Sequence, residues 1–334
     1  MRRSAAKTAF RPTLAEVARL AKVSPATVSR ALNNPNIVAE ETNRRIQEAV
    51  RQTGYVPNLL AGGLASSRSR LVAIIVPVLA RSVFNEMIEA MTEELMAARY
   101  QVMLSLSGHQ DEHLPAIVDS VLARRPEGII LTGMVTDPLL RERLVSTGAT
   151  IIETRHLPGE PIQHVIGFSH HAVGVAVAQA FHELGRRMPL IVAPDTVRSL
   201  ERQNGFTKEM ARLGVRRVST ITMPMPSSVG QGRAALAEFL DNGGKADCVM
   251  CGADWQAHGV IIEAQRRGIR IPEDLAVFGF GNTDFAESME PSLSSVNIDG
   301  RQIGVAAAQI LVERSPGPPT FRDVGFSLIR RESA

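Results

Sequence analysis

From residue 71 onward, short runs of apolar residues alternate with segments whose apolar positions recur at helical spacing. Short apolar runs are typical of buried strands, and the spaced positions are typical of amphipathic helices, one of which we expect over 84–98. Strands that alternate with helices predict parallel sheets. The expected strands are 71–76, 101–107, 128–132, 150–154, 164–168, 188–193, 217–223, 247–252 and 275–280.

The series of strands and helices restarts near Gly185, which indicates an α/β body with two parallel-sheet lobes. We expect the chain to pass from the first lobe to the second near residue 169 and to return near Asn297. A final crossing is expected between Pro316 and Phe326. The expected lobes are about 70–168 plus 298–316 for the first, and about 169–297 plus 317–334 for the second.

The N-terminal region has a different pattern, in which three short segments have helical spacing. Thr13 is a good N-cap for the first helix, and Glu16 three residues later fits a capping box. Ser24 and Pro25 are typical of a helix start, so a second helix is expected after a short break. A third is expected over 40–53. Three helices with a tight turn between the first two predict an all-α helix-turn-helix head.

Positive charge is concentrated in this head. The first 70 residues contain 12 Lys or Arg and four Asp or Glu, a net charge of +8, whereas the whole chain carries +3. The rest of the chain is therefore acidic overall. Nonspecific DNA affinity comes from cations that displace counterions from phosphates. The charge distribution therefore favours a DNA-binding head over the alternative, a purely structural helical bundle.

The second helix of a helix-turn-helix meets base edges through its N-terminal part. Here Ser24, Thr27 and Ser29 have the length of phosphate donors, and Arg30 can donate two hydrogen bonds to a guanine. The Pro-Ala pair before Thr27 is small and apolar. It can contact a thymine methyl but carries no side-chain hydrogen-bond donor. We therefore expect little base information from this helix beyond Arg30.

The segments TLAEVARLAKVSPATVSRALNN and GYVPNLLAGGLAS resemble the LacI/GalR family of bacterial repressors, and the resemblance extends over essentially the whole chain from Thr13. It implies a homodimer or a tetramer on a pseudopalindromic operator of double-stranded DNA, and a body similar to periplasmic binding proteins. The residues that match the family's phosphate and base contacts are Thr13, Ser24, Pro25, Ala26, Thr27, Ser29, Arg30, Asn33, Tyr55 and Asn58.

The segment 57–69, PNLLAGGLASSRS, has the composition of a flexible linker. The resemblance instead implies a hinge helix on the operator, in which Leu64 enters the central base step of the minor groove and Ala61 packs nearby. Gly62 and Gly63 each disfavour a helix by about 0.5–1 kcal/mol relative to Ala. We therefore expect order in this hinge only on DNA. The expected divisions are a basic disordered arm at 1–12, a helix-turn-helix domain at 13–56, the hinge at 57–69 and an effector-binding and dimerisation domain at 70–334.

Polar side chains follow several of the expected strands. Ligands of parallel sheets bind beyond the carboxyl ends of the strands, so two facing lobes predict a small-molecule cleft. Taken singly, each polar residue reads more readily as an ordinary loop residue, but the set at strand ends indicates a site. The effector-binding candidates are Arg81, His156, His170, Arg202, Asp254 and Asn282.

The resemblance supports these candidates unevenly. Arg202 opens an RxxGF signature, which implies that it holds the effector, and Asp254 matches an effector-side acid. The turn at 281–283 matches another polar contact. The chain departs from the family at Arg81 and before Asp254, where Asn is usual, and at His170 with the preceding Ser, where Asp is usual.

The segments VPVLARSVF, IIETRH and VFGFGNTDFA most resemble the gluconate-utilisation repressor branch. A sugar acid needs cations for its carboxylate, and Arg202 with Arg81 would supply them. Asp254, His156 and Asn282 would order its hydroxyls. We therefore expect an inducible repressor whose effector is gluconate or a ketogluconate. The alternatives are a neutral sugar and a corepressor.

Other classes of protein are disfavoured. The chain has no apolar run long enough for a membrane span and no apolar signal stretch in MRRSAAKTAFRP, so we expect a cytoplasmic, nucleoid-associated protein. Cys248 and Cys251 lack a second ligand pair for zinc and are expected to be buried thiols on opposite faces of a strand. GFSHH at 167–171 lacks the last Gly of a nucleophile elbow. We expect no metal, cofactor or catalysis, and the basic head argues against a transport protein.

Overall fold

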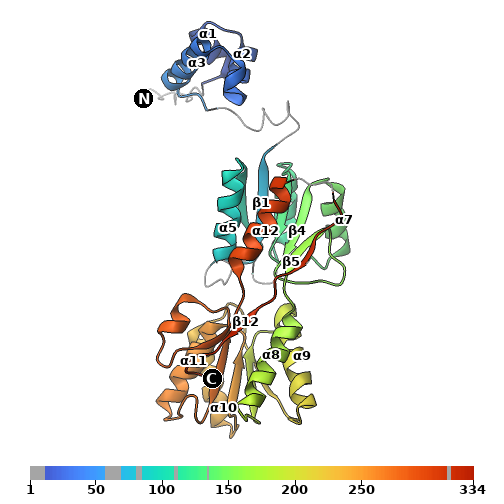
Figure 1. The fold of residues 1–334 in the computed structure, drawn as a ribbon, viewed down its shortest axis with the longest axis vertical. Helices are drawn as coiled ribbons and strands as arrows, with labels where there is room; N and C mark the ends of the chain where they lie inside the picture. The colour runs from blue at the N-terminus through green and yellow to red at the C-terminus, as the bar shows by residue number, and fades with distance from the viewer. Residues whose placement is uncertain (1–11, 57–68, 80–84, 109–111, 134, 314–316) are drawn as a thin grey trace, which may run out of the picture. The chain divides into compact units, whose positions relative to one another are not determined.

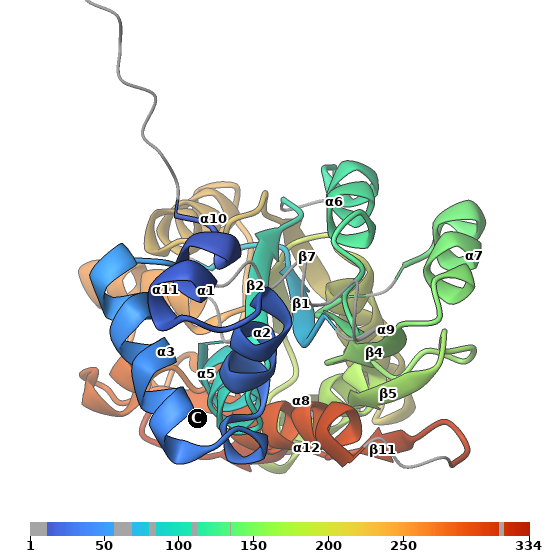
Figure 2. The same cartoon turned by 90° about the horizontal axis from the view of Figure 1, so that it is seen from above.

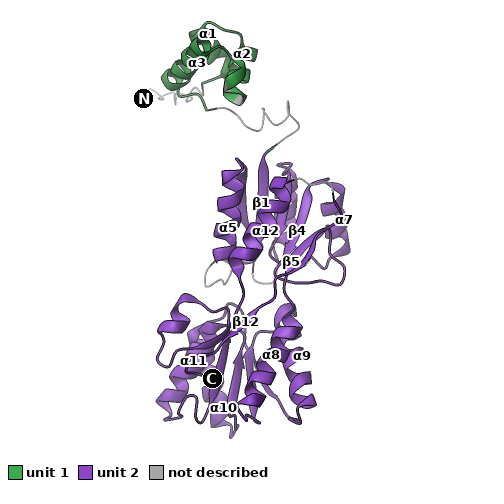
Figure 3. Ribbon diagram, viewed as in Figure 1, with its two compact units in different colours: residues 1–69 green, residues 70–334 purple. Residues whose placement is uncertain are grey.

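The computed structural model describes residues 12–56, 69–79, 85–108, 112–133, 135–313 and 317–334. The chain divides into two compact units, Met1–Ser69 and Arg70–Ala334 (Figure 3). The expected N-terminal arm and most of the expected hinge lie outside the described residues. Of the residues expected to contact DNA or the effector, four also lie outside the described residues, namely Asn58, Ala61, Leu64 and Arg81. Among the described helices, none is long and apolar enough to cross a membrane.

The first unit contains the expected helix-turn-helix. Its described helices are α1 (Leu14–Ala21), α2 (Pro25–Asn33), the 3-10 helix η1 (Pro35–Ile37) and α3 (Glu40–Thr53). Val17, Val28 and Ile46, one from each α-helix, are fully buried in a shared core. Lys22 ends α1 and Gly54 ends α3, both with a left-handed backbone at φ 54° and 65°. These caps turn the chain sharply and let short helices pack on one another.

The second unit contains two sheets, as expected (Figure 1). The strands of the first sheet are β1 (Leu71–Val76), β2 (Gln101–Leu106), β3 (Gly128–Leu131), β4 (Thr150–Thr154), β5 (His164–Gly167) and β11 (Phe321–Asp323). Those of the second are β6 (Pro189–Ala193), β7 (Ser219–Thr222), β8 (Cys248–Cys251), β9 (Ala276–Phe280), β10 (Ser294–Asn297) and β12 (Ser327–Ile329). The orders are β11-β5-β4-β3-β1-β2 and β12-β10-β9-β8-β6-β7, and the described pairs are parallel except β10 with β12.

Helices cover both faces of each sheet. They are α5 (Asn85–Ala97), α6 (Leu114–Leu122), α7 (Pro138–Ser146), α8 (His170–Glu183), α9 (Val197–Arg212), α10 (Val229–Asp241), α11 (Asp254–Arg266), the 3-10 helix η2 (Asp284–Ser288) and α12 (Gly300–Glu313). Val72 and Ile74 of β1 join the core under α5 and α12, whereas Ala73 and Ile75 join the core under α6 and α7 (Figure 2). This alternation follows from the two-residue period of a strand.

The second sheet is layered in the same way, with α8 and α9 on one face and α10 and α11 on the other. Cys248 and Cys251 are buried in these two different cores, which confirms that they face opposite ways on β8. Burial raises the pKa of both thiols above the ordinary value. Neither is therefore a reactive thiolate at neutral pH.

The chain passes between the sheets three times. It leaves the first sheet after β5, and it leaves the second after β10, when α12 packs on α5. The last crossing lies near the end of the expected interval from Pro316 to Phe326 and later than the expected lobe boundary at 316/317. Phe321–Asp323 forms β11 of the first sheet, so the chain returns to the second lobe only between Asp323 and Ser327. The sequence missed β10, β11 and β12 because β10 and β11 are short and mostly polar and β12 has only three residues.

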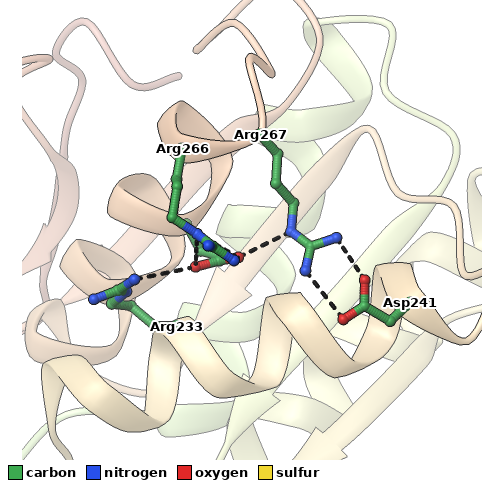
Figure 4. Close-up of polar contacts among 5 residues, drawn as sticks. Arg233, Asp241, Arg266 and Arg267 are labelled. Atoms are coloured by element: carbon green, nitrogen blue, oxygen red, sulfur yellow. Dashed lines mark hydrogen bonds and ion pairs between the residues drawn. The ribbon is translucent and has the colours of Figure 1, made fainter.

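A buried carboxylate joins α10 to α11. Glu263 of α11 is 2% exposed and forms ion pairs with Arg266 at 2.7 Å, Arg267 at 2.9 Å and Arg233 of α10 at 3.5 Å (Figure 4). Arg267 also pairs with Asp241, the last residue of α10, at 2.7 Å. Hydrogen bonds from Arg266 and Arg267 lower the pKa of Glu263 to about 2. The network thus holds these helices together away from the junction between the lobes.

Two glycines bring α8 and α9 into backbone contact. A side-chain carbon at Gly174 of α8 would overlap the carbonyl oxygen of Arg202, and one at Gly205 of α9 would overlap the carbonyl oxygen of His171. The close approach therefore requires glycine at both positions. It places Arg202 of α9 beside the first turn of α8, which begins at His170.

We expect Gly205→Ala to destabilise the protein by about 1–3 kcal/mol, because the helices must separate to admit the methyl group. Gly230→Ala in α10 is the control, since an added carbon there meets no atom within 4 Å and Ala is the better helix former. Chemical denaturation of both variants measures the difference. Equal stability of the two variants would contradict the packing argument.

Candidate DNA interface and inter-lobe basic cluster

Thr13 and Ser24 are the N-caps of α1 and α2, as the sequence predicts. The Thr13 hydroxyl oxygen accepts a hydrogen bond from the Glu16 backbone N–H at 3.3 Å, and the Ser24 hydroxyl oxygen accepts one from the Thr27 backbone N–H at 3.1 Å. The hydroxyls of Ser24 and Thr27 are also within 2.9 Å of each other. These caps satisfy backbone donors that have no partner inside a helix.

The exposed face of α2 presents its first residues and Arg30. Pro25 and Ala26 are exposed, whereas Val28 and Ala31 are buried in the core. Of the proposed contacts outside α2, Thr13 is exposed and Tyr55 is half-buried. The N-terminal end of α2 is therefore accessible to a partner, as in a recognition helix.

The described residues of this unit include exposed cations that form no ion pair. Two arginines of α3 are paired with glutamates one turn away. Arg19, Lys22 and Arg30 are exposed and form no ion pair or side-chain hydrogen bond within the described residues. These cations on or next to α1 and α2 are suited to phosphates and base edges.

In the second unit, basic side chains gather where the lobes meet. We call Arg155, His156, His170, Arg198 and Arg202 the inter-lobe basic cluster. Arg155 and His156 follow β4 in the first lobe, His170 is the first residue of α8, and Arg198 and Arg202 lie on α9. Arg198 and Arg202 are four residues apart and so share a helix face. The fold thus brings the cluster together from three separate segments of the chain.

Contacts across the junction connect the cluster. Arg198 donates from Nη1 to the Thr132 carbonyl oxygen at 2.7 Å. His156 Nδ1 lies 3.5 Å from a carboxylate oxygen of Glu201 on α9. Arg202 Nη1 lies 2.9 Å from His170 Nδ1, and His170 Nε2 lies 2.9 Å from the Arg155 carbonyl oxygen. Each lobe therefore supplies partners to the other.

The local backbone explains part of this arrangement. Arg155 has a left-handed conformation at φ 66°, which turns the chain sharply at the end of β4. Its N–H donates to the Ile166 carbonyl oxygen of β5 at 2.9 Å. The Ser169 hydroxyl oxygen caps α8 by accepting from the Ala172 N–H at 3.1 Å. The cap fixes where α8 starts and hence the position of His170.

The cluster carries more positive than negative charge. Arg155 and Arg202 are 6% and 8% exposed. Burial lowers the pKa of both guanidiniums, and repulsion from Arg198 lowers both further. Among the described residues, Glu201 is the acid that contacts the cluster, and burial raises its pKa. An anion between the lobes would therefore relieve unfavourable electrostatic free energy.

Arg202 is held as an anion-binding side chain would be. Its guanidinium carbon lies 4.0 Å from the centre of the Phe280 ring, at the end of β9, and Nη2 donates to the Gly252 carbonyl oxygen at 3.4 Å. A cation over an aromatic face is stabilised without a counter-ion. The side chain is thus fixed by partners without net charge, and among the described residues no carboxylate forms an ion pair with it.

Asp254 and Asn282 lie in a separate network of the second lobe. Asp254 is fully buried and accepts hydrogen bonds from the Ser295 hydroxyl at 2.6 Å and from the N–H and hydroxyl of Thr283 at 2.7 and 3.0 Å. Asn282 donates to Asn297 at 3.1 Å and accepts from Arg331 at 2.8 Å. Burial raises the pKa of Asp254, and these donors oppose the rise. The two residues thus shape the turn after β9.

The structure brings together three of the six effector candidates, namely His156, His170 and Arg202. Asp254 and Asn282 belong to the neighbouring network, and Arg81 lies outside the described residues. Sequence reasoning did not select Arg198. The available signal was its position one helical turn before Arg202 on α9.

Comparison with known proteins agrees with this architecture. Residues 13–58 match the family described as "Bacterial regulatory proteins, lacI family", and residues 177–334 match the "Periplasmic binding protein-like domain". The "HTH-type transcriptional regulator GntR" of Pseudomonas aeruginosa is 34% identical over 332 residues, which cover 98% of this chain and 97% of that protein. The regulator of the same name from Escherichia coli is 28% identical and covers 95% of this chain and 97% of that protein.

A solved structure supports the same assignment. The crystal structure of a Lacl family transcriptional regulator from Silicibacter pomeroyi superposes with a TM-score of 0.90 at 27% identity and covers 96% of this chain and 99% of that one. The family consists of transcriptional regulators rather than enzymes, in agreement with the lack of a catalytic motif. The chain belongs to the lacI family of bacterial regulatory proteins and is a DNA-binding transcriptional repressor of that family.

Proposed function

We propose that this repressor binds a pseudopalindromic operator as a homodimer and is released when a sugar acid, gluconate or a ketogluconate, occupies the inter-lobe basic cluster. The observation that carries the effector assignment is the excess of guanidinium charge between the lobes. A carboxylate is the part of a sugar acid that such a cluster selects, since guanidinium and carboxylate form strong paired hydrogen bonds.

Several features support the class of effector. Two relatives are regulators named GntR, and three segments of the sequence resemble the gluconate-utilisation branch. Arg202 and Arg198 lie on one face of α9 and can share a carboxylate. His156 offers a ring nitrogen for a hydroxyl. Effector binding would bring charge compensation to the junction, and so it would favour one arrangement of the lobes over another.

The proposed DNA contacts combine the exposed start of α2 with the hinge. Arg30 would read a guanine, and the hydroxyls of α2 would bind phosphates. Leu64, with Ala61 beside it, would open the central base step, so that selectivity would also come from the deformability of that step. Release would follow when a change between the lobes separates the two hinges of the dimer.

For DNA recognition, we expect Arg30→Ala to weaken operator binding by about 1–3 kcal/mol and to relax the preference at one base position. Lys22→Ala is the matched variant, because Lys22 is an equally unengaged cation of the same unit. It should weaken binding on all sequences alike and reduce the salt dependence by about one phosphate contact. Binding titrations on operator and substituted operators at several salt concentrations give both quantities. A uniform loss for Arg30→Ala would show that Arg30 contacts only phosphate.

For the effector, we expect calorimetry to show binding of gluconate or 2-ketogluconate to the full chain. Arg202→Lys should weaken it about 10- to 150-fold, because Lys keeps the charge but loses the two-nitrogen fork, and a hydrogen bond to a charged group contributes about 1.5–3 kcal/mol. Arg212→Lys on the same helix is the control, since Arg212 pairs with Glu209 outside the cluster. If neither acid binds and a neutral sugar or a purine does, the proposed effector class is wrong.

A further inference from the structure

His170 stands between the effector-side arginine and the first lobe. Its Nδ1 faces Arg202 Nη1 at 2.9 Å, and its Nε2 faces the Arg155 carbonyl oxygen at 2.9 Å. Arg202 belongs to α9 of the second lobe, whereas Arg155 directly follows β4 of the first. The imidazole ring is therefore one link in a hydrogen-bonded chain that crosses the junction.

The partners decide which nitrogen of the ring carries the proton. A guanidinium is only a donor, so His170 Nδ1 must accept from Arg202. A carbonyl oxygen is only an acceptor, so Nε2 must carry the hydrogen and donate to Arg155. Both demands are met by a single neutral tautomer. Protonation of Nδ1 would remove the acceptor and break the link.

The ring is also fixed by its surroundings. His170 is 2% exposed, and its ring centre lies 4.5 Å from that of Phe168, 5.9 Å from that of His156 and 6.2 Å from that of Phe280. With both nitrogens engaged and the ring buried, His170 has no polar atom left to offer an effector. It cannot act as the direct effector contact that its place in the sequence predicts without losing one of these bonds.

We propose that His170 is a positioning residue that transmits anion binding at Arg202 to the first lobe through the Arg155 carbonyl. This inference rests on the proposed anion-binding role of the cluster. An anion that attracts the Arg202 guanidinium changes the bond to Nδ1, and the buried ring passes the change to Nε2 and its partner. Arg155 is a suitable recipient, because a non-glycine residue with a left-handed backbone at φ 66° is held there by its surroundings.

Two substitutions separate the two bonds of the ring. An Asn side chain ends near the place of Nδ1, so His170→Asn can still accept from Arg202 but cannot reach the Arg155 carbonyl. A Gln side chain is one bond longer and ends near the place of Nε2, so His170→Gln can donate to Arg155 but offers Arg202 no acceptor at the former position. Both variants have an uncharged amide, which makes them matched controls for each other.

The first readout needs no effector. Amide hydrogen exchange of the peptide 151–156 reports on the Arg155 N–H, which donates to the Ile166 carbonyl. We expect about two- to tenfold faster exchange in His170→Asn than in the wild type, since a lost hydrogen bond shifts local opening by that factor. His170→Gln should retain the wild-type rate. Unchanged exchange in His170→Asn would overturn the link to the first lobe, whatever the effector is.

The second readout is the ratio of operator affinities without and with gluconate or 2-ketogluconate. His170→Asn should lose about two- to tenfold of this ratio, measured at a saturating concentration of the acid. His170→Gln should instead lose affinity for the acid. A full ratio in His170→Asn would overturn the proposal. If neither acid changes the operator affinity of the wild-type protein, the effector class proposed above is wrong. The hydrogen-exchange measurement alone then decides whether His170 links Arg202 to the first lobe.

A third readout tests the neutral ring. Burial, and then repulsion from Arg202, Arg198 and Arg155, holds the pKa of His170 well below its usual range. The other charged or titratable groups around it are His156 after β4, His171 on α8 and Glu201 on α9, and all remain in the variants. Below about pH 6.5 the unfolded chain binds a proton that the native ring excludes. Relative to His170→Asn, the wild-type folding equilibrium constant should therefore fall about tenfold per pH unit between pH 6 and 5. If the folding equilibrium constants of the two proteins depend on pH in the same way, the native ring accepts a proton. The proposed hydrogen-bonded link through His170 would then be wrong.

Discussion

The contacts between the two lobes of this structure depend on positive charge that is buried at their junction. Removing a guanidinium from water costs several kcal/mol, and each neighbouring cation adds to that cost. Arg155 and Arg202 are nevertheless almost completely buried. For Arg202, the Gly252 carbonyl and the face of Phe280 supply partners that carry no net charge. The folded protein therefore holds buried positive charge at this junction, and the proposed anionic effector would lower its electrostatic free energy.

The same constraint explains the state of His170. A second positive charge beside Arg202 would be strongly unfavourable, so the ring is neutral and its tautomer is set by what it faces. The lobes are consequently joined by directional bonds rather than by packing alone. Directional bonds have discrete arrangements, and a ligand that alters one of them can shift the balance between arrangements.

Close packing of α8 on α9 makes these contacts available. Gly174 and Gly205 remove the side chains that would keep the helices apart, and Arg202 then reaches the first turn of α8. On the other face of the second sheet, the Glu263 network ties α10 to α11, while Asp254 anchors the turn after β9. The second lobe is thus held together by contacts of its own, separate from those that join the two lobes.

Local patterns by themselves determined the helix-turn-helix, the two series of buried strands and the basic head, because caps, periodicity and charge act within a few residues of one another. The resemblance to the family, rather than these patterns, marked Arg202 through its RxxGF segment. Only the tertiary structure decided that Arg198 joins the site, that Asp254 is saturated by Thr283 and Ser295, and that β11 returns to the first sheet. These features depend on segments far apart in the chain. A short polar strand has no periodic signal of its own, and the partners of a buried charge exist only once the chain has brought them together.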